Sequence, residues 1–272
     1  MKDGCAPYPP SLAEKVRELA SKYEKREFLM GDPSVFMHRY SSVKDKEIVA
    51  LVAAALAFGK RSEILSHIEA FLAFMGNESP SVWLLKGKYE DFLPDSKRSF
   101  YRIFTYGNLR CMCNALKGIL SQFGSLGTCL EQDYRNGECD RHKGRLAVVL
   151  ASHFPEECSP LISKGEDSAN KRLNLFLRWM VRTGSPVDLG LWSWYPATEL
   201  LMPLDTHVVS VAKEFGFLSG KGSASLSQAI KLTEIMKTFF PDDPLKGDFA
   251  LFGYGIEQSQ MQTGGHAKSV HE

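Results

Sequence analysis

Residues 168–182 read SANKRLNLFLRWMVR and residues 203–217 read PLDTHVVSVAKEFGF, and these two stretches decide the fold that the sequence predicts. In the first stretch the apolar residues recur at intervals of three and four, which is typical of an amphipathic helix. The second stretch has a similar spacing and reaches Gly216, a residue type that commonly ends a helix. The start of each predicted helix carries one reactive group, an amine at Lys171 and a carboxylate at Asp205.

Lys171 has the features of a nucleophile. Ser168 is placed to cap the helix, which would put Lys171 in the first turn, where unpaired N–H groups make the local field positive. Together with the like charges of Arg172 and Lys164, this field favours the neutral amine that a nucleophilic lysine needs. The alternative is an ordinary solvated lysine at a helix start, which propensity alone favours.

Asp205 also has two interpretations. After Pro203 it is well placed as the N-cap of the second helix, and taken alone this role is sufficient to explain it. No capping box supports the cap, because the residue three positions further on is Val208. A carboxylate that stabilises a developing cation would instead need an open site beside it.

Residues 204–217, LDTHVVSVAKEFGF, resemble the segment of helix–hairpin–helix DNA glycosylases that carries their invariant aspartate. The run 171–180, KRLNLFLRWM, is similar to the second helix of their hairpin motif, where the catalytic lysine of bifunctional members begins a K-T-A-N-V-type run. The usual hairpin L-P-G-V-G is replaced by residues 164–168, and a long connection, residues 186–203, separates the two stretches. Archaeal-type 8-oxoguanine glycosylases have a long connection at the same place. The chain therefore looks like a divergent bacterial branch of this superfamily, nearest to them in layout.

This resemblance implies an all-α fold of two lobes with a cleft between them. Residues 44–184 would form a six-helix barrel lobe that ends in the hairpin motif, and residues 1–43 would join residues 185–260 in the second lobe. The polar segment 261–272 is expected to be a disordered tail. The residue pattern itself indicates helices throughout, and residues 44–58 are apolar on all sides, which predicts a central buried helix.

The resemblance also assigns roles to individual residues. Lys171 would be the Schiff-base nucleophile, and Asp205 would be its electrostatic partner. The expected contacts with the base pocket or the DNA are Phe58, Lys60, Arg61, Arg172, Trp192, Trp194 and His207.

Two groups of these contacts also have simpler explanations. Phe58 could fill the gap left by an extruded base while Lys60 and Arg61 hold phosphates, but an ordinary glycine-terminated helix with flanking charges has the same sequence. Trp192 and Trp194 could stack on a flipped purine, or they could plug the gap between the lobes.

Composition bounds the remaining possibilities. The chain has 272 residues, 44% of them hydrophobic, which suffices for a substantial core. Its net charge of +1 is not the strong basic excess common in nucleic-acid-binding proteins, so phosphate contacts would require a local basic face. The N-terminus lacks the apolar core of a signal peptide, and the longest apolar run, residues 48–58, is too short to span a bilayer. We therefore expect a cytoplasmic, nucleoid-associated monomer with no membrane partner.

The cysteines predict neither disulfides nor a metal centre. The six residues follow no paired framework, which indicates a reducing compartment. Five side chains could serve as zinc ligands by their chemistry, but their spacing in the sequence fits no standard pair of zinc ligands, so no metal is expected. Those five are Cys111, Cys113, Cys129, Cys139 and His142. No cysteine follows Cys158, so the C-terminal four-thiolate iron–sulfur loop of many related glycosylases is absent, and no cofactor is expected.

The functional prediction is a base-excision DNA glycosylase with lyase activity. It would remove an oxidised purine, 8-oxoguanine by family layout, from double-stranded DNA through a Schiff base on Lys171. Two alternatives remain open. The first is a monofunctional glycosylase in which Asp205 activates water, and the second is a non-catalytic helical DNA-binding module.

Overall fold

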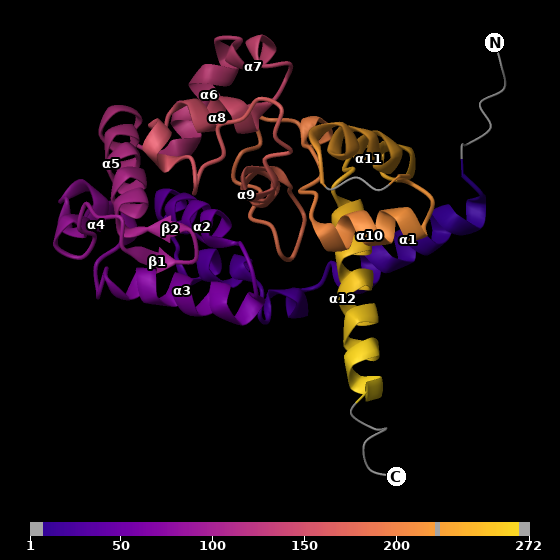
Figure 1. Cartoon of the computed structure of the whole chain (residues 1–272). Helices are drawn as coiled ribbons and strands as arrows, with labels where there is room; N and C mark the ends of the chain where they lie inside the picture. Colours follow the sequence, from indigo (N-terminus) through magenta and orange to yellow (C-terminus); the bar gives the residue numbers. More distant parts are fainter. Residues whose placement is uncertain (1–7, 221–223, 267–272) are drawn as a thin grey trace.

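The computed structural model describes residues 8–220 and 224–266, and helices dominate its secondary structure (Figure 1). Among these residues the only sheet is an antiparallel pair of short strands. The all-α class predicted from the sequence is therefore confirmed at this coarse level. In chain order the elements are α1 (Pro10–Tyr23), η1 (Arg26–Leu29), η2 (Pro33–Arg39), α2 (Val43–Leu56), α3 (Arg61–Ala73), α4 (Pro80–Leu85), η3 (Lys88–Asp91), β1 (Ser99–Tyr101), β2 (Phe104–Thr105), α5 (Tyr106–Phe123), α6 (Leu126–Arg135), α7 (Glu138–Arg141), α8 (Leu146–Ser152), η4 (Glu156–Cys158), α9 (Lys171–Val181), η5 (Ala197–Glu199), α10 (Thr206–Glu214), α11 (Leu226–Phe239) and α12 (Lys246–His266).

Helix α2 is the centre of a larger group of helices that runs from α2 to α9. Residues 47–56 are all buried, and α3, α4, α6 and α9 pack around them. The prediction of a central buried helix is therefore confirmed. Glu47 is the acidic exception inside this apolar surface, and burial raises the pKa of its carboxyl. Its oxygens accept hydrogen bonds from the backbone N–H groups of Leu126 and Gly127 and from Nε1 of Trp192, so the buried carboxyl is not left without partners.

The two ends of the chain meet in a smaller group of helices. Helix α1 packs along α12, α10 also packs on α12, and α11 contacts both α1 and α12; Figure 1 shows indigo α1 lying beside yellow α12. The contact between α1 and α12 is close, because a Cβ added at Gly253 would lie 2.2 Å from the ring of Tyr23. Lys22 also pairs with Glu257 at 2.8 Å. The smaller group is thus built from opposite ends of the sequence.

Helix α9 is joined to the smaller group by buried ion pairs. Arg182 donates to both oxygens of Asp243 at 2.8 Å and to Glu24 Oε1 at 2.7 Å. Arg182 and Arg178 also share the fully buried carboxylate of Asp188. An unpaired charge in such an interior costs several kcal/mol, on the order of 3–5 when one partner is removed. These pairs therefore fix how α9 lies against the C-terminal helices.

The structure corrects the helical prediction for residues 95–105. Residues 99–101 and 104–105 form the strands β1 and β2, and Arg102 occupies the turn between them with a left-handed φ of 52°. The helix α5 begins only at Tyr106, because Thr105 and Asn108 form a capping box there. The aromatic residues before that cap suit a half-buried strand as well as a helix, so the pattern alone did not distinguish them.

The structure corrects part of the prediction that residues 261–272 form a disordered tail. Helix α12 continues to His266, so residues 261–266 are helical, and residues 267–272 lie outside the described residues. Met and Gln, which begin this stretch, are good helix formers and allow the helix to continue. Neither α12 nor any other helix in the described part of the chain is both long and apolar enough to cross a membrane.

Candidate functional site

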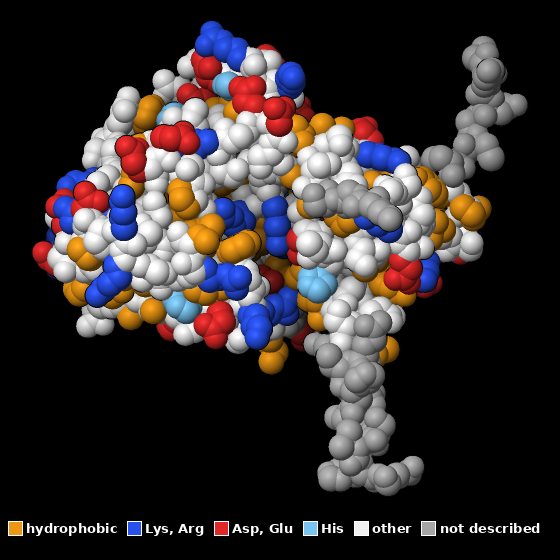
Figure 2. Space-filling view, viewed as in Figure 1, with side chains coloured by type: hydrophobic (Ala, Val, Ile, Leu, Met, Phe, Trp, Pro, Cys, Tyr) orange, Lys and Arg blue, Asp and Glu red, His pale blue; other side chains and the backbone are white. Residues whose placement is uncertain are grey.

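A large pocket opens between the two groups of helices. Its volume is about 910 Å³, and its walls come from the α2–α3 connection, the start of α9, the start of α10 and one face of α12. Figure 2 shows the molecule hollowed in this region, with Lys and Arg side chains gathered around the opening. Segments that are far apart in the sequence thus supply one cavity.

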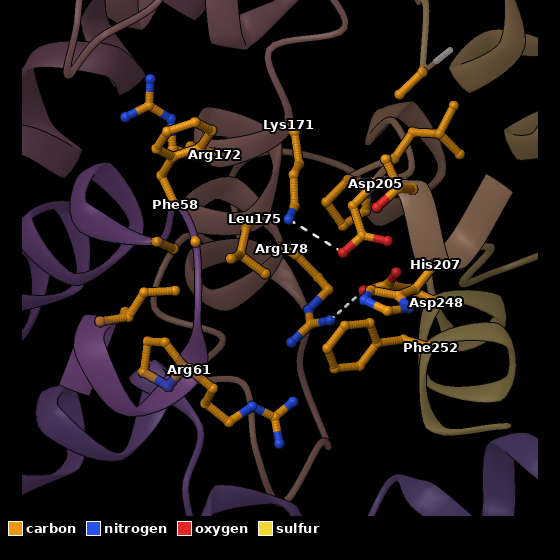
Figure 3. A pocket seen from close by; sticks show the side chains of 18 of the residues that line it. Phe58, Arg61, Lys171, Arg172, Leu175, Arg178, Asp205, His207, Asp248 and Phe252 are labelled. Carbon is orange, nitrogen blue, oxygen red and sulfur yellow. Dashed lines mark hydrogen bonds and ion pairs between the residues drawn. The ribbon is translucent and has the colours of Figure 1, made fainter. Parts of the chain in front are cut away.

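Lys171 and Asp205 face each other across this pocket. Nζ of Lys171 lies 3.1 Å from Oδ2 of Asp205, and Figure 3 shows the two side chains pointing toward each other. The lysine side chain is 37% exposed and that of the aspartate is 14% exposed. The pair therefore combines a partly desolvated carboxylate with an amine that solvent and a ligand can reach.

The chain places Lys171 at the first position of α9 by an unusual turn. Asn170, the residue before the helix, has a left-handed conformation with φ 44° and ψ 43°, and its side chain makes no capping hydrogen bond. The prediction that Ser168 caps the helix is wrong, because its Oγ accepts instead from the backbone N–H of Asn170 at 3.1 Å. Lys171 is nevertheless at the helix start, as predicted, where the unpaired N–H groups of the first turn lie.

Asp205 caps α10 and also contacts Lys171 in the pocket. Its Oδ1 accepts from the backbone N–H of Val208 at 2.8 Å, so it is the N-cap of α10, as predicted. Its Oδ2 is the oxygen that meets Lys171. The cap fixes the rotamer of the side chain, and this leaves the second oxygen directed at the amine in the pocket.

One rim of the pocket is formed by the α2–α3 connection and the β1–β2 turn. Phe58 is 44% exposed there, and the guanidinium of Arg102 lies 5.0 Å from the centre of its ring. Between them Gly59 has a φ of 114°, and an added Cβ would lie 2.6 Å from an Arg102 nitrogen, so glycine is required at this position. Lys60 and Arg61 follow at the start of α3 and also line the pocket. The structure therefore brings Phe58, Lys60 and Arg61 to the site, and it adds Arg102, which the sequence did not single out.

Arg172 lines the pocket, but its guanidinium is engaged by the protein. Nη1 donates to the carbonyl oxygen of Ala55 at 2.5 Å, and Nη2 donates to that of Pro160 at 2.7 Å. Burial lowers the pKa of Arg172 to about 10. Arg172 thus fastens the first turn of α9 to the end of α2, and it positions Lys171 instead of offering free donors to DNA.

His207, in the first turn of α10, is exposed and lines the pocket.

The structure does not bring Trp192 and Trp194 to the pocket. Trp192 is buried, and its Nε1 donates to Glu47 Oε1 at 2.8 Å. Trp194 stacks on Trp192 with ring centres 5.5 Å apart and also contacts Tyr134. The two rings therefore pack on each other and on neighbouring aromatic side chains, and neither lines the pocket.

Helix α12 supplies two pocket residues that the sequence analysis did not assign to the site. Asp248 lines the pocket and forms a buried ion pair with Arg178, and Phe252 lies one helical turn further on (Figure 3). Burial raises the pKa of Asp248 to about 6, against the opposing effect of Arg178. The guanidinium of Arg61 lies 5.6 Å from the centre of the Phe252 ring. The sequence pattern that could have identified these two residues is an acidic and an aromatic side chain four positions apart, which lie on one face of a helix.

The five side chains that the sequence offered as candidate zinc ligands do not lie together in the structure. Of the five candidates, Cys129 alone belongs to a group of three metal-ligating side chains in the described part of the chain, and its neighbours are Asp133 and His153. Cys158 Sγ instead lies 2.8 Å from Cys111 Sγ.

Comparison with known proteins identifies a family. The model of the family described as "Protein of unknown function (DUF2400)" matches residues 32–257, a range that includes Lys171, Asp205 and Asp248. No curated protein matches the chain, and no solved structure matches it.

Proposed function

The chain belongs to the DUF2400 family, and we propose that it is a base-excision DNA glycosylase with lyase activity on double-stranded DNA that carries an oxidised purine such as 8-oxoguanine. One observation carries this proposal. The amine of Lys171 lies 3.1 Å from the carboxylate of Asp205 inside a pocket that is open to solvent. A nucleophilic amine, a fixed negative charge and room for a nucleotide are what base excision through a Schiff base needs.

In the proposed reaction, Nζ of Lys171 attacks C1′ of the extruded nucleotide while the glycosidic bond breaks. The base leaves with the electron pair of that bond and acquires a proton. Lys171 must lose a proton before it attacks, and Oδ2 of Asp205 lies within hydrogen-bond distance to accept it. Asp205 passes this proton on to the departing base and, ionised again, stabilises the positive charge that develops on the sugar. The C1′–O4′ bond then breaks, O4′ takes up a proton and the sugar ring opens to give the imine. The imine allows removal of a proton from C2′ and departure of the 3′ phosphate, which cleaves the strand.

The dimensions and lining of the pocket suit an extruded nucleotide. A volume of about 910 Å³ falls within the range of roughly 300–1,000 Å³ that is usual for small-molecule sites. When it is ionised, the carboxylate of Asp248 accepts hydrogen bonds only, so it matches a base edge that carries N–H donors. The rings of Phe58 and Phe252 line the same cavity, and we propose that they supply its stacking surfaces.

The rim of the pocket supports contact with duplex DNA. Lys60, Arg61 and Arg102 lie beside Phe58, so positive charge is local although the chain as a whole carries only +1. We infer that these cations hold phosphates on either side of the flipped nucleotide, and that Phe58 fills the gap it leaves.

The proposed fold is the two-lobed arrangement of helix–hairpin–helix glycosylases. Residues 44–184 would be the barrel lobe, residues 1–43 and 185–260 would be the second lobe, and the duplex would lie across the pocket between them. The packing of α1 on α12 and the central position of α2 support this assignment. The proposed enzyme acts as a monomer in the cytoplasm, associated with the nucleoid.

Borohydride trapping on a duplex oligonucleotide with a single 8-oxoguanine tests the proposal. The unaltered protein should form a covalent adduct, and Lys171→Gln should form none. Lys60→Gln is the matched control, because it removes an amine from the rim and should weaken binding while the adduct still forms. An adduct that survives Lys171→Gln would refute the nucleophile. Absence of any excision from 8-oxoguanine, other oxidised purines or abasic sites would refute the activity.

A monofunctional glycosylase is the second candidate, and the same ion pair favours it. In that case Lys171 remains a cation held by Asp205, and the carboxylate directs water to C1′. The product would be an abasic site in an intact strand, with no trapped adduct. A non-catalytic DNA-binding module would instead bind duplex in a salt-dependent way and be indifferent to Lys171→Gln and Asp205→Asn.

A further inference from the structure

A cluster of three side chains with metal-ligating atoms lies between α6 and the end of α8. Cys129 and Asp133 are four residues apart on α6 and therefore share one face of that helix. His153 is the residue at the C-terminal end of α8. Their potential ligand atoms, one from each residue, all lie within 4.8 Å of one another.

We propose that Cys129, Asp133 and His153 bind a zinc ion, with water as the fourth ligand. A thiolate, an imidazole and a carboxylate are all zinc ligands, and three protein ligands with one open position are common in zinc proteins. This site is separate from the pocket, since none of the three residues lines it. The inference therefore does not depend on the proposed glycosylase activity.

The distances in the cluster are near those of a tetrahedral site. Cys129 Sγ lies 3.7 Å from both Nδ1 and Nε2 of His153, and sulfur and nitrogen ligands on one zinc ion lie about 3.5 Å apart. Only one ring nitrogen can bind the ion, so the imidazole must also rotate until the lone pair of that nitrogen points to it. Nε2 of His153 also lies 2.5 Å from Oδ2 of Asp133, which is the separation of two atoms that share a proton. A zinc ion would replace that proton and push the two atoms apart by about 1 Å, which side-chain rotation can supply.

The burial of the cluster suits a bound cation. Cys129 is fully buried, whereas the side chains of Asp133 and His153 are 21% and 23% exposed. The sulfur thus closes the inner side of the site, and the outer side is open to the ion and to water. Without a metal ion, burial raises the pKa of the Cys129 thiol to about 12, so the thiol is protonated. Zinc binding forms three bonds to protein atoms and one to water and releases the thiol proton to solvent. The imidazole proton of His153 moves to the ring nitrogen that does not bind the ion, and no oxidation state changes.

The same three residue types also occur in Cys–His–Asp catalytic triads, and the structure argues against that interpretation. A nucleophilic cysteine needs a depressed thiol pKa and access for its substrate. Cys129 lacks that access, because its side chain is fully buried. A metal ion is small enough to reach the sulfur from the side of Asp133 and His153.

The proposed ion would join α6 to the end of α8, which is attached to the segment ahead of the pocket residue Lys171. Nζ of Lys164 donates to the carbonyl oxygen of Ala151 at 2.6 Å and also to that of Phe154, so the end of α8 is attached to the turn that precedes α9. We therefore expect zinc to act as a structural link that stabilises the segment ahead of Lys171.

Cobalt substitution tests the site. Co²⁺ added to the full chain after treatment with a chelator should bind in a 1:1 ratio and give a thiolate-to-cobalt absorption band together with the visible bands of a tetrahedral ion. Zn²⁺ should displace it and raise the thermal unfolding temperature. Cys129→Ser should abolish the thiolate band, and Asp133→Asn and His153→Asn should each weaken Co²⁺ binding by at least 10-fold.

The control is Cys158→Ser. Cys158 lies 2.8 Å from Cys111, so this variant removes a buried thiol outside the proposed site. The band should be unchanged in this variant. Absence of a thiolate band in the unaltered protein, its persistence in Cys129→Ser, or its loss in Cys158→Ser would each overturn the proposal. If Cys129→Ser does not fold, Asp133→Asn decides the question, because it alters a partly exposed side chain and retains its shape. Rapid alkylation of Cys129 in the metal-free protein would favour the triad instead and would also overturn it.

Discussion

Asp248 forms an ion pair with Arg178 in the wall of the pocket, and the side chains are only 6% and 3% exposed (Figure 3). Burial raises the pKa of Asp248 to about 6, the nearby charge of Asp205 adds to this effect, and Arg178 opposes it. An aspartate in the wall of the pocket therefore changes its charge near pH 6. This change of charge can be followed by measuring the stability of the protein as well as its activity.

The first prediction concerns the pH dependence of stability. The pKa of Asp248 is about 6 in the folded chain and about 3.9 in an unfolded one, so the folded state binds more protons between these values. The stabilisation from the protonated carboxyl is therefore complete below about pH 4 and is lost as the pH rises through 6. The unfolding temperature of the unaltered protein, relative to Asp248→Asn, should fall from pH 4 to about pH 6.5 and then stay level. A difference that grows with pH would contradict the assignment.

The second prediction separates the two roles of Asp205. Asp205→Asn keeps an acceptor for the backbone N–H of Val208, so the free energy of unfolding should change by less than about 0.5 kcal/mol. The same variant removes the negative charge beside Lys171, and single-turnover excision should slow on the order of 100-fold or more.

Asp205→Ala is the matched variant, because it removes both the charge and the cap. It should lose a comparable amount of activity and, in addition, about 1 kcal/mol of stability. Equal stability of the Asn and Ala variants would show that the cap contributes nothing. Full activity in Asp205→Asn would show that the charge is not needed.

The third prediction concerns Phe58 at the rim. Because the ring is 44% exposed, Phe58→Ala should change the free energy of unfolding by no more than about 0.5 kcal/mol. If the ring fills the gap left by a flipped nucleotide, excision from duplex DNA should slow at least 10-fold more than excision from single-stranded DNA. Phe92→Ala is the control, because Phe92 is equally exposed and does not line the pocket. A uniform effect on both substrates would exclude the wedge role.

Local patterns in the sequence were sufficient to find the two chemical groups of the pocket. The position of Lys171 at a helix start and the capping role of Asp205 depend on the residues directly around them, and both are present. The burial of α2 was also predictable, since a helix with apolar residues on every side must be surrounded. Ser168 failed as a cap because Asn170 adopts a left-handed conformation, which a propensity argument does not anticipate.

Contacts between distant residues could not be predicted in this way. Trp192 was assigned to the pocket by its aromatic character, but its position is set by Glu47, which lies 145 residues away in the chain. Asp248 depends on Arg178, which lies 70 residues away in the chain, for its buried ion pair. The placement of Arg102 required the β1–β2 turn. In each case a tertiary partner, which one sequence does not reveal, decides what the side chain does.

The fourth prediction concerns the charge network behind the pocket. Arg182 is nearly inaccessible and contacts Glu24, Asp188 and Asp243. Arg182→Met would leave the buried carboxylate of Asp188 with Arg178 as its remaining partner, and it should reduce the free energy of unfolding by about 3–5 kcal/mol in urea titrations. Arg182→Lys should lose less, because it retains the charge but not the two-point contact with Asp243.

A double variant identifies the cause of that loss. Asp188→Asn introduced together with Arg182→Met removes the buried negative charge that the single variant leaves without compensation. It should therefore recover part of the lost stability, a coupling that the double-mutant cycle measures directly. If the two substitutions simply add, the loss in Arg182→Met arises from packing against Phe249, whose ring centre lies 5.2 Å from the guanidinium, and not from an unpaired charge.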